Sequence, residues 1–131
     1  MIFNAKKTIG GNNFKGDLTF DRVDINIGDG LDGTSGIFKV PVTGIYKMSF
    51  SGQTAWNKIS ANQIHVIKNG SDMFYITDGN WGEKAGANNL SYTWIMKLVK
   101  GDELKLFSYR YLFASSTEPL TFTGELIHIE N

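Results

Sequence analysis

The sequence predicts an all-β fold, built as a sandwich of short strands, and three observations lead to this prediction. Apolar and polar residues alternate in several short runs, and no segment of useful length has helical periodicity. The 131 residues include 15 Gly and only 2 Pro, a composition typical of many turns around short strands. Hydrophobic residues make up 41% of the chain and aromatic residues 13%, enough to build one core. We therefore expect a single domain over residues 1–131.

Four strands are expected in the first part of the chain. Residues 2–5 form the first strand, and the clean alternation of residues 23–27 indicates a half-buried second one. The segment 10–16 between them is rich in Gly and Asn and is expected to be a loop. Residues 38–40 form a short third strand, and residues 45–50 alternate between two faces as the fourth.

The strongest local prediction is a hairpin in the middle of the chain. The apolar runs 64–67 and 73–76 flank Asn69 and Gly70. Both of these residues accept the positive φ angles that a type I′ turn requires, so the two runs are expected to pair. A polar, Gly-rich loop is expected at 77–89.

Three further strands are expected after this loop. Residues 92–99 and 103–113 are joined by the short turn 100–102, and the last strand covers residues 120–127. We find no internal repeat and no second domain.

A narrower signal lies between Phe20 and Phe50. Its members are Phe20, Asn26, Leu31, Phe38 and the run Gly44-Ile45-Tyr46-Lys47-Met48-Ser49-Phe50, and Gly36 and Pro41 complete the pattern. Their order and spacing resemble the signature of the complement C1q globular-head family, a branch of the tumour-necrosis-factor-like jelly rolls. Met48 stands where the family usually has Phe, and a flexible apolar Met can fill the same site. The resemblance covers nearly the whole chain and implies a ten-strand-type jelly-roll β-sandwich that assembles as a homotrimer.

The composition excludes several functional classes. The 13 basic and 13 acidic residues balance, so no overall field favours nucleic acid or an anionic membrane. No apolar run has the length needed to span a bilayer. The absence of Cys excludes disulfides, Cys-ligated zinc and a thiol nucleophile.

We expect no enzymatic activity. Residues 28–33 read Gly-Asp-Gly-Leu-Asp-Gly, but turn and strand residues follow them, whereas a dinucleotide site needs a helix at that point. His65 and His128 both lie within expected strands, and no Gly-x-Ser-x-Gly or His-Glu-x-x-His motif accompanies them. We interpret residues 28–33 as a solvated turn.

The loop after the hairpin is a candidate calcium site. Oxygen ligands in a Gly-rich loop suit a hard cation, and the resemblance implies that acidic residues in this loop coordinate calcium near the apex of the trimer. Asp78 falls where the first ligand would be, and Glu83 or Asn88 would supply the second. A plain polar surface loop is the alternative.

Four aromatic residues recur with period two in the strand 103–113, namely Phe107, Tyr109, Tyr111 and Phe113. They lie on the face opposite the leucines of the same strand, so the strand is apolar on both faces. Such a strand is covered either by its own fold or by another subunit. The resemblance places this sheet on the three-fold axis, so we expect these four residues at the trimer interface, with plain core packing as the alternative.

The candidate ligand contacts are Trp56, Asn80, Trp81, Tyr109, Arg110 and Tyr111. Exposed aromatic rings can stack on the apolar face of a sugar or anchor a protein contact. Arg110 lies between two tyrosines and can hold a carboxylate. The simpler alternatives are that the Trp residues cap the end of the sandwich and that Arg110 satisfies an acid at a strand edge.

The resemblance implies a non-enzymatic recognition module that binds extracellular ligands as a trimer. Microbial or cell-surface carbohydrate is the expected ligand, as in lectin-like proteins of innate immunity. A receptor-binding signalling or organiser head and a structural trimerisation cap of a fibrous protein remain alternatives. We expect a secreted protein although no signal peptide is visible, and the triplets at Asn69 and Asn89 are candidate glycosylation sites.

Overall fold

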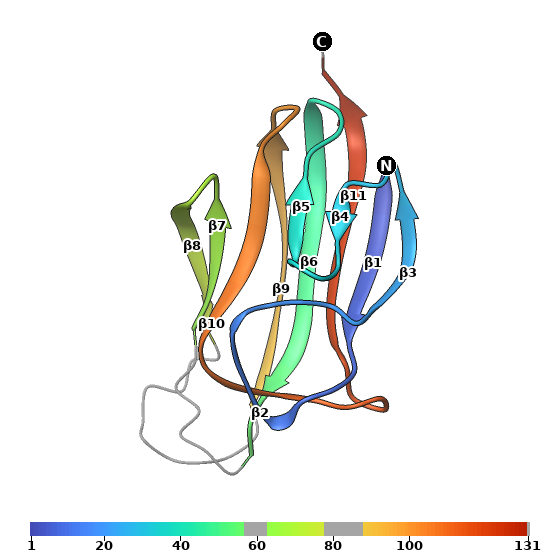
Figure 1. Cartoon of the computed structure of the whole chain (residues 1–131). Helices are drawn as coiled ribbons and strands as arrows, with labels where there is room; N and C mark the ends of the chain where they lie inside the picture. Colours follow the sequence, from blue (N-terminus) through green and yellow to red (C-terminus); the bar gives the residue numbers. More distant parts are fainter. Residues whose placement is uncertain (57–62, 78–87, 131) are drawn as a thin grey trace.

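The computed structural model describes residues 1–56, 63–77 and 88–130, in which every regular element is a β-strand (Figure 1). The strands are β1 (Ile2–Lys7), β2 (Gly11–Asp17), β3 (Arg22–Ile27), β4 (Leu31–Asp32), β5 (Ile37–Lys39), β6 (Gly44–Thr54), β7 (Gln63–Lys68), β8 (Ser71–Thr77), β9 (Asn89–Leu98), β10 (Glu103–Ala114) and β11 (Leu120–Ile129). The expected all-β class is confirmed. These residues contain no helix able to cross a membrane.

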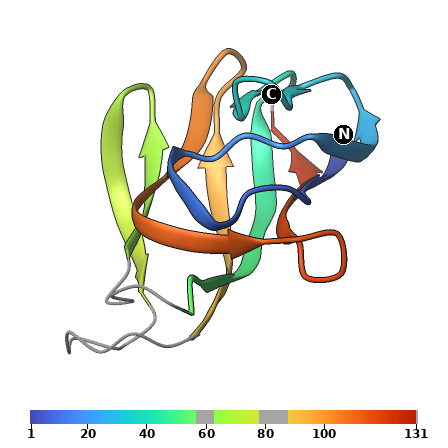
Figure 2. The same ribbon diagram turned by 60° about the horizontal axis from the view of Figure 1, so that its bottom comes forward.

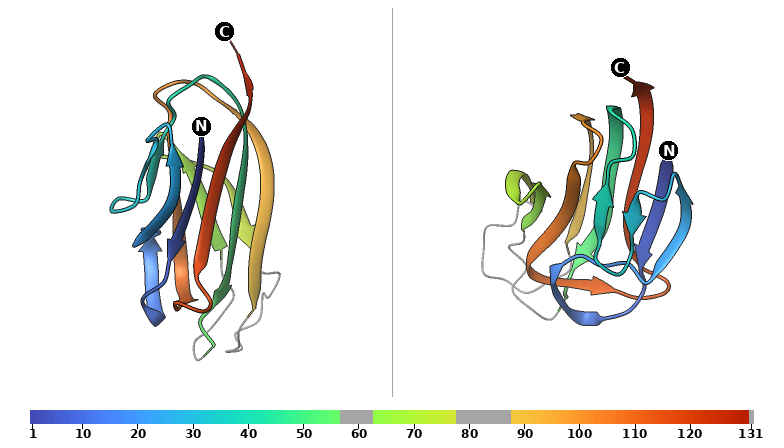
Figure 3. Two further views of the ribbon diagram at one scale, coloured as in Figure 1. Left: turned by 90° about the vertical axis from the view of Figure 1, so that its right-hand side faces the viewer. Right: turned by 45° about the horizontal axis from the view of Figure 1, so that its top comes forward.

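The strands form two layers, which Figure 3 shows from the side. Sheet I has the order β3-β1-β11-β6-β9, and all its pairs are antiparallel. Sheet II has the order β8-β7-β10. On the other edge of β10 lie both β2 and β5, and β4 pairs with β5. The far end of β10 also pairs with β6, and this contact joins the two sheets at one end (Figure 2). The result is a nearly closed jelly-roll sandwich.

Aromatic side chains fill the space between the sheets. The Phe3 ring of sheet I lies 4.9 Å from the Phe38 ring of β5 and 5.0 Å from the Phe122 ring, centroid to centroid. Tyr46 continues the cluster at 5.7 Å from Phe38. All four side chains are fully buried. Deleting one buried Phe side chain typically costs about 3–5 kcal/mol of stability, so this cluster is a major part of the core.

The residues of the spaced signature have structural roles. The Asn26 side chain donates to the Leu31 carbonyl and accepts from the Leu31 backbone N–H, which closes the turn before β4. Gly36 has a φ of 74°, and a Cβ there would lie 1.7 Å from the Leu18 carbonyl oxygen, so only Gly fits. The buried Tyr46 hydroxyl donates to the Val42 carbonyl, and burial raises the pKa of this hydroxyl. The signature therefore specifies the scaffold.

The predicted hairpin is present, with β7 and β8 paired around Asn69 and Gly70. Their φ angles are 52° and 83°, as a type I′ turn requires. The Asn69 amide also donates to the Asp102 carboxylate at 3.0 Å and accepts from the Glu103 backbone N–H at 2.8 Å. This side chain thereby ties the hairpin to the turn before β10.

Two local expectations were wrong. Residues 10–16 are not a loop, because most of them belong to β2, which pairs with β10 and packs Phe14 against the core. Residues 23–27 are not half-buried throughout, because β3 is an edge strand whose side chains are mostly exposed. Residues 28–33 form a turn without a helix, as expected, but Leu31 and Asp32 belong to the short strand β4, and Leu31 is buried rather than solvated.

Asp102 is predicted to make stability depend on pH. Hydrogen bonds from the Asn69 side chain and from the Val99 backbone N–H hold the pKa of this carboxyl below its usual value. A carboxyl with a lowered pKa stabilises the folded state above its unfolded pKa of about 3.9, and the contribution is lost as pH falls through the lower folded pKa. We expect Asp102→Asn to lower the Tm at about pH 6 and this difference to shrink below about pH 4. Thermal melts across this range would contradict the assignment if the difference stayed constant.

Candidate functional site

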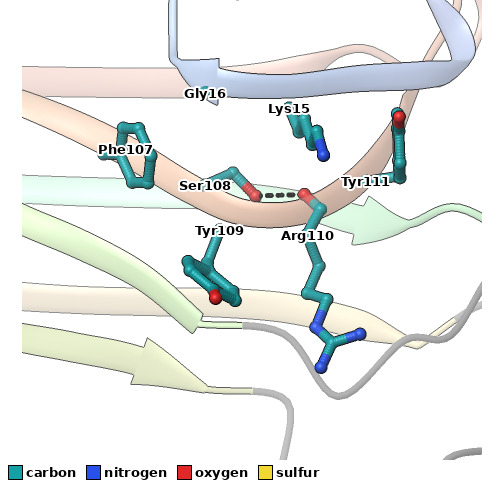
Figure 4. Close-up of a pocket in the computed structure, with 7 residues that line it drawn as sticks. All are labelled: Lys15, Gly16, Phe107, Ser108, Tyr109, Arg110 and Tyr111. Carbon is teal, nitrogen blue, oxygen red and sulfur yellow. Dashed lines mark hydrogen bonds between the residues drawn. The ribbon is translucent and has the colours of Figure 1, made fainter.

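A hollow of about 750 Å³ lies on sheet II, along β10 and β2 (Figure 4). The residues that line it are Lys15, Gly16, Phe107, Ser108, Tyr109, Arg110 and Tyr111. Five of these residues are consecutive in β10, and the other two come from the neighbouring strand β2.

The hollow forms where the pairing of β10 and β2 is irregular. Ser108 is opposite Gly16, whereas the next described pair joins Leu112 to Phe14, so the two strands change register between these points. Gly16 has a φ of 103° and presents no Cβ, which leaves the space beside β10 open. The Ser108 hydroxyl donates to the Arg110 carbonyl at 2.7 Å and helps to hold the bent backbone.

Two cation–aromatic pairs line the hollow. Lys15 Nζ lies 4.8 Å from the centre of the Tyr111 ring, and the Arg110 guanidinium carbon lies 5.9 Å from the centre of the Tyr109 ring. Figure 4 shows Tyr109 and Arg110 extending to the same side of the β10 ribbon. Such pairs are worth about 0.5–1 kcal/mol at exposed sites, and they orient the charged groups over the rings.

The hollow carries positive charge and exposed aromatic surface. Tyr109 is 65% exposed, and Phe107 and Tyr111 are half-buried. None of the described residues that line the hollow is acidic. The acid that follows Gly16 on β2 is Asp17, which forms an ion pair with Lys105 at 3.3 Å. The described lining therefore places two cationic side chains beside exposed aromatic surface.

The structure brings together three of the six predicted ligand contacts, namely Tyr109, Arg110 and Tyr111. Trp56 is exposed just after β6 and does not line the hollow. The remaining two, Asn80 and Trp81, lie outside the described residues.

The predicted calcium ligands Asp78 and Glu83 also lie outside the described residues. Within residues 1–56, 63–77 and 88–130, no three His, Asp or Glu side chains gather closely enough to hold a metal ion. Calcium binding therefore stays a prediction.

Of the four aromatic residues expected at the trimer interface, Phe107, Tyr109 and Tyr111 line the hollow, whereas Phe113 lies beyond it on the same strand. Their role in an interface stays a prediction.

Lys15 was not predicted, because residues 10–16 were expected to be a loop. The signal that could have found it is the alternation around Phe14, which packs against the core and leaves Lys15 on the outer side.

Sheet I offers a second surface that the sequence did not indicate. Phe3 and its neighbours of the same parity face the core, so Ile2 faces outward. The register places Ile2 beside Ile27 on one strand and beside Glu125 on the other. The same row continues through Lys47 to Ile95 on β9. Ile27 and Ile95 are both largely exposed at the two ends of this row.

A shallow hollow of about 390 Å³ lies on this outward face, next to Asn4. Among the described residues Asn4 Oδ1 is a buried side-chain oxygen without a hydrogen-bond partner. Ile25, which is exposed, is the cross-strand neighbour of Asn4. An unsatisfied buried acceptor costs about 1–3 kcal/mol, so a donor that reached Asn4 from outside would stabilise the protein.

The nearly closed two-layer sandwich defines a jelly-roll domain. The sequence model of the C1q domain matches residues 2–127, and the chain therefore belongs to the C1q domain family.

The relatives and structural neighbours agree with this assignment. The chain is 29% identical over 89 residues to complement C1q tumor necrosis factor-related protein 3 of Mus musculus and of Homo sapiens. The match covers 68% of this chain and 35% of those proteins, so the chain spans about a third of their length.

Two solved structures show the same fold. The globular domain of zebrafish complement 1qA protein superposes with a TM-score of 0.74 at 16% identity, over 98% of each chain. Murine APRIL at pH 5.0 superposes with a TM-score of 0.68 at 14% identity, over 95% of this chain and 98% of that one.

Proposed function

We propose that the protein is a non-enzymatic recognition module that acts outside the cell, assembles as a homotrimer and binds carbohydrate. The observation that carries the proposal is the hollow on sheet II, which two Tyr residues and two cations line without an acidic residue among the described lining residues. Membership of the C1q domain family supports recognition rather than catalysis.

Carbohydrate suits this hollow for a geometric reason. Sugar rings present one flat, apolar face, which stacks on an aromatic ring, and hydroxyl groups at their edges, which accept and donate hydrogen bonds. Tyr109 provides an exposed ring with the Arg110 guanidinium beside it, and Lys15 provides a further donor at the Tyr111 ring. A single open site of this kind binds weakly, so three copies on one particle would raise the avidity for a repetitive surface.

The outward face of sheet I supports self-association. Exposed Ile25, Ile27 and Ile95 lie on this face, and apolar area of this kind is stabilised by burial against another copy. The partner could also supply the donor that Asn4 Oδ1 lacks among the described residues. We therefore propose sheet I as the trimer interface, in place of the aromatic residues of β10. The hollow of sheet II would then stay open to ligands.

A receptor-binding head is the second candidate function. The relatives that match the chain are named as complement C1q tumor necrosis factor-related proteins, and this name favours a signalling role. The exposed aromatic residues of β10 would then anchor a protein ligand.

Calcium binding by Asp78 and Glu83 is a further proposal, which rests on the composition of their loop.

The assembly face can be tested with a matched pair of substitutions. Ile95 on β9 is 62% exposed, and Ile9 in the connection between β1 and β2 is 61% exposed. We expect Ile95→Asp to convert the trimer to monomer, because three like charges would be buried in the interface. Ile9→Asp and Tyr109→Asp should leave the trimer intact.

Light scattering coupled to size exclusion would measure the mass, and circular dichroism would show that each variant is folded. A trimer for Ile95→Asp together with a monomer for Tyr109→Asp would reject sheet I and support the interface on β10.

A glycan array with the intact oligomer tests carbohydrate recognition. We expect binding to a restricted set of glycans, and weaker binding by Tyr109→Ala, because the variant removes the exposed stacking ring. Equal signal on every glycan, or no signal, would contradict the proposal. The same array in the presence of a chelator, repeated with Asp78→Ala, tests the calcium proposal, which predicts that both treatments reduce binding equally.

A further inference from the structure

We propose that Asn69 is a site of spontaneous deamidation, and that its conversion to a carboxylate releases the β7–β8 hairpin from the turn between β9 and β10. The 131 residues contain a single Asn-Gly pair, Asn69-Gly70. Two features of the structure distinguish it, namely the hydrogen bonds of the Asn69 side chain and the open space at Gly70. Neither feature depends on the proposed ligand or on the assembly of the protein.

Asn69 joins the tip of the hairpin to the neighbouring turn through three hydrogen bonds. Its backbone N–H donates to the Glu103 carbonyl at 2.8 Å, and its side-chain oxygen accepts from the Glu103 backbone N–H at 2.8 Å. Its side-chain nitrogen donates to the Asp102 carboxylate at 3.0 Å. The turn is bound in its own right to the rest of the sandwich, because the Val40 backbone N–H donates to the Asp102 carbonyl at 2.9 Å. The Asn69 amide therefore acts both as a donor and as an acceptor at this junction.

The residue after Asn69 favours the chemistry. Deamidation begins when the Gly70 nitrogen attacks the side-chain carbonyl carbon of Asn69. The new N–C bond closes a succinimide ring, and the amide nitrogen leaves as ammonia with the proton from the Gly70 N–H. Water then opens the ring at either carbonyl and gives aspartate or isoaspartate, so no other reactant is needed. A side chain on the attacking residue would crowd the first step, whereas Gly70 has none and even a Cβ there would meet nothing within 4 Å.

Both products disrupt the junction. The aspartate product has no donor, so its carboxylate would face that of Asp102 across the gap that the present hydrogen bond spans at 3.0 Å. Like charges this close repel each other, and the single positive charge of Lys68, which lowers the pKa of Asp102, cannot offset two carboxylates. The isoaspartate product adds a carbon to the backbone of a two-residue turn whose length fixes the register of β7 against β8.

The hairpin also supports the candidate site. β7 pairs with β10 as far as Ser108, which lines the hollow on sheet II. Loss of the contact between Asn69 and the turn frees the opposite end of the same pair of strands, next to Leu104. Deamidation is therefore expected to loosen the edge of sheet II that holds β10 in place.

Mass spectrometry of the ageing protein tests the chemistry. Folded protein from a host that adds no glycan is incubated at mildly alkaline pH beside the same protein in guanidinium, and both are digested. Conversion raises the mass of a peptide by about 1 Da. We expect it at Asn69 in both samples, and faster there than at any other Asn.

Two substitutions connect the rate to the structure. The hydrogen bond to Asp102 restrains the Asn69 side chain and must break before the carbonyl carbon can turn toward Gly70. Asp102→Ala should therefore speed the conversion severalfold in the folded protein. Asp72→Ala removes the same charge from the same hairpin, away from these contacts, and should leave the rate unchanged.

An exchange of the two groups tests the consequence for stability. Asn69→Asp reproduces the aspartate product and should lower the Tm. Combining it with Asp102→Asn again places an amide donor opposite a carboxylate. The double variant should therefore be more stable than Asn69→Asp alone and should recover most of the lost Tm, because the two side chains are in direct contact.

Three results would overturn the inference. They are conversion of Asn69 in guanidinium but not in the folded protein, a Tm that Asn69→Asp leaves unchanged, and a double variant that recovers none of the lost Tm. If Asn69→Asp does not fold, circular dichroism of the double variant decides, since a folded double variant supports the contact and an unfolded one contradicts it.

Discussion

Phe3 packs across the space between the two sheets against Phe38, and beside it against Phe122 of its own sheet, and this contact fixes the distance between the layers. The packing requires a Gly at position 124, because a Cβ there would lie 2.5 Å from the Phe3 ring. With the layers held in this way, the inward-facing residues of every strand lie in the core. Because side chains alternate along a strand, the residues between them form the outer surface of each sheet. The two outer surfaces are thus consequences of one packing arrangement.

The two outer surfaces differ in kind. Sheet I shows a continuous cross-strand row that ends in exposed isoleucines, and the buried Asn4 oxygen has no partner among the described residues, features that fit a contact with another copy. Sheet II is interrupted where β10 changes register against β2, and the interruption opens a hollow lined by Tyr109 and Arg110. The exposed isoleucines of sheet I suit self-association and the hollow of sheet II suits a small ligand, so a single sandwich can serve both purposes.

The sequence predicted the scaffold well because its residues are buried and periodic. Asn26, Tyr46 and the hairpin at Asn69 and Gly70 each have a local role that the residue type reveals. The prediction from sequence was wrong for residues 10–16. Gly and Asn predict a loop locally, whereas the pairing of β2 with β10 is a tertiary contact. For the same reason Lys15 was missed. Alternation also cannot tell which outer face another subunit covers, so the exposed isoleucines of sheet I were not recognised as a surface.

The central claim is that the outward face of sheet I is covered in the assembled protein while the hollow of sheet II stays open. The chain has no Cys, so one introduced thiol reports on one position. Ile95 is 62% exposed and Tyr109 65% exposed in the single chain, and the two positions should therefore react alike in a monomer. The direct measurement is the rate of thiol alkylation in the assembled Ile95→Cys and Tyr109→Cys variants. We expect Tyr109→Cys to react fast and Ile95→Cys to react much more slowly until the oligomer is dissociated. Fast reaction at Ile95→Cys with protection at Tyr109→Cys would contradict the account.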